Sequence, residues 1–313
     1  MIMLQILLKW FKFFRLNRLF GRAMVIALPY GWHIVFFLIP FIIVLGLSFS
    51  ESILSAPPFT PLFTWVDDSF LQLRLNFGNY IVLFEDDFYI SAYYESLKIA
   101  ATATFFCFII AYPIAYGIAR ASPSMRIILL ILVILPFWTS FLIRVYSWIG
   151  ILSNQGLLNS ALLSLGIIKK PLSLLNTHFA VIVGIVYSYL PFMIFPLYAA
   201  LQKLDPQMLE AASDLGCKPL RAFFTITLPL SMQGAIAGSM LVFIPAIGEF
   251  VIPELLGGSD TLMIGKVLWT EFFTHRDWPM ASALAVTLLT FLVIPIIAFQ
   301  KLLLRTQERR IKL

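Results

Sequence analysis

The sequence predicts an all-α integral membrane protein with about six transmembrane helices. Hydrophobic residues make up 60% of its 313 residues and charged residues only 12%, whereas a soluble domain is about one quarter charged. The mean hydropathy is +0.93. Six apolar stretches each reach the roughly 20 residues that a helix needs to cross a bilayer. They cover about residues 23–50, 92–119, 127–151, 177–201, 231–256 and 279–302.

The N-terminal residues 1–22 are expected to lie at the cytoplasmic membrane surface. They contain five basic residues and no acidic residue, interleaved with aromatic side chains, a composition typical of an amphipathic interfacial segment. The apolar run that follows is too long for a cleavable signal peptide and lacks a small-residue cleavage site. Pro29 and Pro40 predict kinks in this first span.

The distribution of charge predicts the orientation of the chain. Basic residues concentrate at both termini and in the turn with Arg120 and Arg126, whereas the long connections carry most of the acidic residues. By the positive-inside rule, the termini, that turn and the connection 202–230 are cytoplasmic. A transmembrane domain of residues 23–302 is therefore followed by a basic cytoplasmic tail, 303–313. The predicted external segments are 51–91, where prolines limit us to expecting a short helix or two, 152–176 and 257–278.

Residues 202–230 predict a helix–turn–helix hairpin between two spans. Gly216 suits a left-handed helix cap, and Pro219 suits the first turn of a second helix. A small rigid amphipathic hairpin is well suited to docking into a groove on a soluble partner. Apolar residues recur at helical spacing along its first half: Leu204, Met208, Ala211 and Leu215.

No catalytic, nucleotide-binding or metal-binding motif stands out. The glycine-containing stretch 258–266 has Asp260 where a Walker A loop needs a glycine. The three histidines are scattered, and Cys107 and Cys217 form neither a disulfide framework nor a metal-ligand spacing. The basic residues lie at the chain ends and in short connections between apolar stretches, which argues against nucleic acid as the main partner. We expect no catalytic residue, no metal and no cofactor on this chain.

The hairpin carries a recognisable motif. Residues Glu210 to Pro229, EAASDLGCKPLRAFFTITLP, match the pattern EAA-x3-G-x9-I-x-L-P without a gap. The chain therefore resembles the membrane subunits of bacterial type I ABC importers, which contain this EAA loop. The resemblance implies a MetI-like permease fold and a hairpin seated in a cleft of an ATP-binding subunit. It also implies that Glu210 contacts that subunit, that Ala211 and Ala212 allow close approach, and that Gly216 permits the turn.

Two further stretches narrow the resemblance. Residues 135–144, LPFWTSFLIR, and 245–258, PAIGEFVIPELLGG, are similar to the PotB/PotH-type permease subunits of spermidine/putrescine importers. The resemblance implies a multi-pass protein of the bacterial inner membrane that forms half of a permease heterodimer. It further implies a homodimer of ATP-binding subunits, which hold ATP and Mg, and a periplasmic polyamine-binding protein as partners.

A carboxylate inside the fifth predicted span suggests a pathway for a cationic substrate. Glu249 lies between Pro245 and Pro253, and an intramembrane carboxylate is costly unless it faces a cavity or a partner. Broken helices of this kind occur at transporter sites, and aromatic rings hold ammonium groups by cation–π contact. A structural ion pair of Glu249 with Arg144 or with the partner subunit, and simple packing of the aromatic rings, remain alternatives. The candidate pathway residues are Glu249, Glu254, Trp138, Tyr146 and Trp148.

Other function classes fit the sequence less well. An ABC importer permease for another small solute would carry the same EAA loop. A gradient-driven secondary transporter would need an inverted repeat and a coupled ion site, and it would leave the hairpin unexplained. A membrane enzyme would need a nucleophile–base or metal constellation that the sequence lacks.

Overall fold

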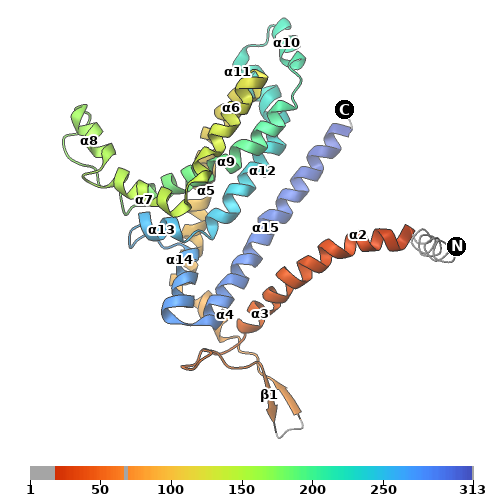
Figure 1. Cartoon of the computed structure of the whole chain (residues 1–313), viewed down its shortest axis with the longest axis vertical. Helices are drawn as coiled ribbons and strands as arrows, with labels where there is room; N and C mark the ends of the chain where they lie inside the picture. Colours follow the sequence, from red (N-terminus) through yellow and green to blue (C-terminus); the bar gives the residue numbers. More distant parts are fainter. Residues whose placement is uncertain (1–17, 67–69, 312–313) are drawn as a thin grey trace, which may run out of the picture. The chain divides into compact units, whose positions relative to one another are not determined.

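The structure, a computed structural model, describes residues 18–66 and 70–311 (Figure 1). Its contacts define two compact units. The first contains the residues up to Asn79 together with Asp277–Val286, and the second contains Tyr80–Arg276 and Thr287–Leu313. The predicted interfacial segment, residues 1–22, lies mostly outside the described residues, as do the last two residues of the tail.

The first unit begins with an apolar helical run that confirms the first predicted span. It consists of α2 (Arg18–His33), the π-helical η1 (Ile34–Leu38) and α3 (Ile39–Leu47). Val25–Leu47, 23 residues long, is apolar enough to cross a membrane. Pro40 has no N–H to donate to the preceding turn, so the α-helical hydrogen-bond pattern cannot continue through it. The π-helical η1 lies at this interruption.

A β-hairpin follows in the first unit, where we expected only short helices. Strands β1 (Phe63–Val66) and β2 (Phe70–Leu73) pair antiparallel, with Phe63 opposite Leu73 and Trp65 opposite Leu71. Because side chains alternate between the faces of a strand and Phe63 pairs directly with Leu73, the side chains of Phe63, Trp65 and Leu73 share one face. The helical expectation is correct only for α4 (Gly78–Glu85).

Three long helices form the core of the second unit: α5 (Asp87–Arg120), α9 (His178–Gln202) and α12 (Leu228–Ile247). Each of the three belongs to a helical segment that is apolar and long enough to cross a membrane. This confirms the second and fourth predicted spans and most of the fifth. Small residues let them approach closely. A Cβ added to Gly234 of α12 would lie 2.4 Å from the carbonyl oxygen of Pro196 in α9. Buried small residues line α5 at helical spacing: Ala92, Ala100, Ala103, Cys107, Ala111 and Ala115.

The third predicted span, 127–151, is wrong as a single straight helix. Helix α6 (Pro123–Ile134) continues into the 3₁₀ turn η2 (Leu135–Trp138), and α7 (Phe141–Leu152) and α8 (Leu157–Ser164) follow. The two parts meet at an angle of 88°. Thr139 and Ser140 between them are extended, with ψ values of 154° and 137°. Extended residues cannot continue a helix, so the chain turns sharply there.

Of the about six predicted spans, four are confirmed as long apolar helices and the third is a bent pair. The described residues contain four helices long and apolar enough to cross a membrane, or five if the bent pair counts as one span. The sixth predicted span lies in α15 (Trp278–Ile311), whose described apolar part is Trp278–Ile294. The orientation of the termini stays a prediction.

The remaining elements connect the long helices. The region between α9 and α12 contains α10 (Gln207–Asp214), α11 (Pro219–Ala222) and the π-helical η3 (Phe223–Thr227). After α12 the chain breaks at Gly248, within the fifth predicted span and between Pro245 and Pro253, before α13 (Val251–Leu256). Helix α14 (Ile264–Trp269) and the π-helical η4 (Thr270–His275) lead to α15.

Candidate functional site

The predicted hairpin is formed by α10 and α11, and its turn depends on Gly216. Helix α10 ends in a Schellman motif, in which the N–H of Gly216 donates to the oxygen of Ser213 at 2.8 Å and the N–H of Cys217 to that of Ala212 at 2.9 Å. The φ angle of Gly216 is +76°, a left-handed conformation that favours glycine. Pro219 is the first residue of α11. Both sequence predictions for this turn are confirmed.

The hairpin exposes apolar side chains on a polar element. Leu215 is 88% exposed and Leu220 is 76% exposed. Glu210 and Ala211 are also exposed, whereas Ala212 is half-buried. In Figure 1 the hairpin lies at one end of the second unit, beyond the ends of α9 and α12. Apolar residues surrounded by polar ones at such a position are typical of a protein interaction surface.

A cavity of about 400 Å³ lies where α12 breaks. Three segments of the second unit line it, namely η2 with α7, the middle of α9, and the α12–α13 junction. Its volume is in the range of small-molecule sites. The lining residues are Phe137, Phe141, Arg144, Ser188, Tyr189, Phe192, Pro245, Gly248, Glu249, Phe250 and Val251.

Glu249 is the acidic group of this cavity, and neutral donors hold it in place. The residue is only 8% exposed. One carboxylate oxygen accepts a hydrogen bond of 2.5 Å from the hydroxyl of Tyr189, and the other accepts the N–H of Val251 at 3.1 Å. Because Val251 is the first residue of α13, the carboxylate caps the N-terminus of this short helix. The break in α12 thus fixes a buried carboxylate at the cavity wall.

Arg144 is the basic group of the same cavity, and aromatic rings hold it. Its Cζ lies 4.7 Å from the ring centre of Phe137 and 5.9 Å from that of Phe141. Its Nη1 donates to the carbonyl oxygen of Pro136 at 3.0 Å. Among the described residues, no ion pair joins Arg144 to Glu249. The structural ion pair that we considered for these two residues is therefore not formed.

The other candidate pathway residues lie outside the cavity. Glu254 forms an ion pair of 3.1 Å with Lys266. Trp138 and Tyr146 are 78% and 57% exposed. Trp148 packs edge-to-face against the ring of Tyr187, with ring centres 5.5 Å apart. The structure thus brings only Glu249 of the five into the cavity.

The aromatic residues that do line the cavity were missed in the sequence. The rings of Phe137 and Phe192 pack edge-to-face with their centres 5.5 Å apart. The ring centre of Tyr189 lies 6.1 Å from that of Phe192. Phe137 is adjacent to the predicted Trp138, so the stretch was identified but the wrong ring was chosen. The 3₁₀ turn at η2 sets which side chain faces inward, and hydropathy carries no signal for that turn.

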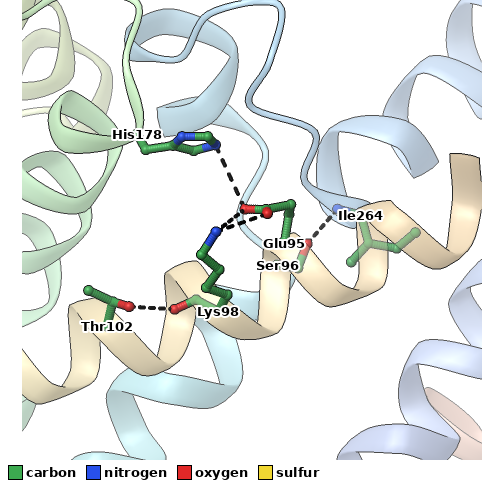
Figure 2. A network of polar contacts seen from close by, with 6 residues as sticks. All are labelled: Glu95, Ser96, Lys98, Thr102, His178 and Ile264. Atoms are coloured by element: carbon green, nitrogen blue, oxygen red, sulfur yellow. Dashed lines mark hydrogen bonds and ion pairs between the residues drawn. The ribbon is translucent and has the colours of Figure 1, made fainter.

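A second polar network links three segments of the second unit (Figure 2). Glu95 on α5 lies 3.1 Å from the ammonium group of Lys98 and 3.8 Å from Nε2 of His178 at the start of α9. The neighbouring Ser96 accepts the N–H of Ile264, the first residue of α14, at 2.7 Å. These contacts hold the starts of α9 and α14 against α5, which supports the segments around the cavity.

Known proteins resemble this chain over most of its length. Residues 99–313 match the family described as binding-protein-dependent transport system inner membrane component. The spermidine/putrescine transport system permease protein PotB of Haemophilus influenzae is 40% identical over 280 residues, which cover 90% of this chain and 93% of that protein. PotB of Escherichia coli K12 is 41% identical over 258 residues, covering 82% and 89%. The crystal structure of a bacterial alginate ABC transporter in complex with alginate pentasaccharide-bound periplasmic protein shares the fold, with a TM-score of 0.65, 17% identity, and coverage of 90% of this chain and 96% of that one.

Proposed function

Because the chain belongs to the family of binding-protein-dependent transport system inner membrane components, we propose that it is the membrane-spanning permease subunit of an ATP-driven importer for polyamines such as putrescine and spermidine. The similarity to PotB, at 40% identity over 90% of the chain, carries this conclusion. The protein is accordingly a multi-pass protein of a bacterial inner membrane. The resemblance to the alginate importer supports the fold alone, since it is 17% identical.

The chemistry of the cavity suits an alkylammonium group. A polyamine consists of ammonium groups separated by methylene chains. The carboxylate of Glu249 can accept hydrogen bonds from an ammonium group, and charge-assisted hydrogen bonds of this kind are the stronger ones. The rings of Phe137, Phe192 and Phe250 offer apolar contact for methylenes and cation–π contact for the charge.

The chain itself is not expected to hydrolyse ATP, and the hairpin supplies the proposed link to the subunits that do. We assign ATP and Mg to a homodimer of ATP-binding subunits and no cofactor to this chain. The exposed Leu215 and Leu220 suit a groove on such a subunit. Glu210 would contact that subunit, while Ala211 and Ala212 would allow close approach. A second permease subunit would complete the pathway, and a periplasmic polyamine-binding protein would deliver the substrate.

The proposed cycle begins with docking of the loaded binding protein on the external loops. Binding of ATP closes the two ATP-binding subunits, and the hairpin transmits this movement to α9 and α12, to which it is directly joined. The path between the two permease subunits then opens outward, and hydrolysis returns it to the inward-open state. In this scheme the free energy of ATP drives the movement of the hairpin, α9 and α12, and Glu249 provides a fixed point of substrate contact.

The function is tested by purifying the chain with its co-expressed neighbours. ATPase activity is measured in lipid with no binding protein, with unloaded binding protein, and with binding protein loaded with putrescine or spermidine. Stimulation by a polyamine-loaded protein is the expected result. An associated ATPase without any polyamine response would overturn the substrate and leave an importer permease for another solute. The absence of an associated ATPase would contradict the role of the hairpin and favour a gradient-driven transporter.

A further inference from the structure

Arg144 places a permanent positive charge in the cavity that the proposed function assigns to a cation. Both Arg144 and Glu249 line this cavity, but each is held by its own partners. Tyr189 and backbone N–H groups hold the carboxylate. Aromatic rings and one carbonyl oxygen hold the guanidinium group. Two opposite charges therefore share one cavity without forming a direct pair.

The guanidinium group is incompletely satisfied where it lies. Its Nε is buried and, among the described residues, has no hydrogen-bond acceptor. Leaving a buried charged donor without an acceptor is costly. The ring faces of Phe137 and Phe141 are the kind of surface on which an ammonium group would also rest. Arg144 thus occupies the cation-binding surface of the cavity with an unsatisfied Nε–H. This free-energy cost would be relieved if the side chain moved away from the rings.

Resting on the proposed polyamine function, we propose that Arg144 is a resident cation that competes with the substrate for the aromatic surface of this cavity. Without substrate, its charge balances that of Glu249 across the cavity. An arriving ammonium group takes its place beside Phe137 and Phe141, and Arg144 turns away. On return of Arg144 the substrate is released. The residue keeps the affinity of the cavity low, as a transport site requires, and it sets specificity by admitting only cations able to displace it.

A purely structural role would make Arg144 a helix cap, and the chain provides a comparison for that role. Arg126 donates from Nη2 to the carbonyl oxygens of Ala119 and Ala121 at 3.1 and 3.2 Å. Its Nε is likewise buried and has no acceptor among the described residues. Arg126 is not among the residues that line the cavity. It therefore serves as the control for loss of an arginine that caps a helix end.

The test measures equilibrium binding of radiolabelled spermidine to the purified permease–ATPase complex. The complex is placed in phosphatidylcholine nanodiscs, without binding protein, so that neither anionic lipid nor the delivery protein contributes. In Arg144→Gln, spermidine should bind about 5 to 30 times more tightly than in the wild type, the range between an exposed and a desolvated cation–π contact. Maximal uptake with saturating loaded binding protein should fall, because release slows. Arg144→Lys keeps a cation over the rings and should bind spermidine as the wild type does.

The outcomes separate this proposal from the function on which it rests. A wild-type complex that gives no ATPase response to polyamine-loaded binding protein contradicts the proposed function itself. If the wild type responds, unchanged or weaker spermidine binding in Arg144→Gln overturns the resident-cation role. An equal increase in Arg126→Gln would assign the effect to loosened helix ends and would overturn it as well.

A second variant guards against misassembly of Arg144→Gln. Arg144→Met keeps the apolar stem of the side chain against Phe137 and Phe141 and should also bind spermidine more tightly. Added methylguanidinium can occupy the vacated ring surface in this variant and should reduce spermidine binding towards the wild-type value. No reduction at concentrations that leave the wild type unaffected would contradict the proposal.

Discussion

Gly216 is required by backbone conformation and not by lack of space. A Cβ added there would meet nothing within 4 Å, yet φ is +76°. A β-branched residue in this conformation costs about 1–2 kcal/mol. Gly216→Val should therefore insert into the membrane normally but distort the end of α10 and abolish transport-coupled ATP hydrolysis. The measurement is the ATPase activity of the reconstituted complex with and without loaded binding protein.

Gly166 offers a matched control for this prediction. Its φ is +70°, and an added Cβ would again meet nothing within 4 Å. It lies in the connection after α8, far along the chain from the hairpin. Gly166→Val carries the same backbone strain and should leave coupling intact. Normal coupling in Gly216→Val, or equal loss in both variants, would show that the hairpin turn has no special role.

The charge of Glu249 is predicted to matter more than its shape. Glu249→Gln keeps an acceptor for the hydroxyl of Tyr189 but removes the negative charge from the cavity. Hydrogen bonds to charged groups contribute about 1.5–3 kcal/mol. Polyamine uptake should therefore fall by about 10- to 100-fold. Uptake of labelled putrescine and spermidine into proteoliposomes measures this loss.

Glu271 is the control because it matches Glu249 in burial. It is also 8% exposed and accepts a tyrosine hydroxyl, that of Tyr89 at 3.0 Å. It differs in position, since it lies on η4 and does not line the cavity. Glu271→Gln should change uptake much less than Glu249→Gln. Similar losses in both variants would indicate that any buried carboxylate of this protein is needed for folding.

At the residue scale, a structural role can be predicted from the sequence where only one conformational requirement explains the residue type. Gly216 and Pro219 were identified because a left-handed cap and a first helical turn restrict the choice of residue. Glu249 was identified because a carboxylate inside a membrane span is costly unless it faces a cavity or a partner. The rings of Tyr189 and Phe192 were missed, since an aromatic residue in an apolar helix is equally suited to lipid, core or cavity. Only the packing of α9 against its neighbours separates these cases.

The contact between α9 and α12 depends on the absence of side chains. A Cβ on Gly234 would lie 2.4 Å from the oxygen of Pro196 and 2.5 Å from Cβ of Ala200. Overpacking of this kind typically costs about 1–3 kcal/mol. Gly234→Ala should lower the thermal unfolding temperature of the purified complex. Because α9 and α12 flank the hairpin, uptake should fall as well.

Gly117 supplies the contrasting helical glycine. An added Cβ at this position of α5 would meet nothing within 4 Å. Alanine is favoured over glycine inside a helix by about 1 kcal/mol. Gly117→Ala should leave the unfolding temperature unchanged or raise it. A decrease as large as that of Gly234→Ala would refute the role of close packing.

At the element scale, hydropathy identified the long helices but not their internal geometry. The spans of α5 and α9 were predicted closely because length and apolar content suffice for a helix in lipid. The 88° bend between α6 and α7 was missed, since the residues on both sides of Thr139 and Ser140 are equally apolar. The β-hairpin was missed because the prolines of that segment suggested irregular structure, whereas the strands start after them. At the bend, the extended residues Thr139 and Ser140 change the direction of the chain without changing its apolar composition.

The bend also bears on the number of membrane crossings in the second unit. Figure 1 places the start of α6 and the hairpin α10–α11 at the same end of the second unit. The bent pair α6–α7 and the helix α9 lie between them along the chain. Two positions on the same side of a membrane require an even number of crossings between them. With both positions on the cytoplasmic side, as the charges of Arg120 and Arg126 predict, the bent pair counts as one crossing.

A native cysteine allows the orientation of the hairpin to be tested. Cys217 follows Gly216 in the hairpin and is half-buried, whereas Cys107 is fully buried in α5. A membrane-impermeant maleimide should label Cys217 in inside-out vesicles and not in intact spheroplasts. Bound ATP-binding subunits should reduce the labelling, because the hairpin is then covered. Asp260→Cys, in the external loop predicted after α13, should show the opposite sidedness in a Cys217→Ser background. Labelling of Cys217 from outside would place the hairpin away from ATP, and coupling through it would then be impossible whatever the similarity to other permeases.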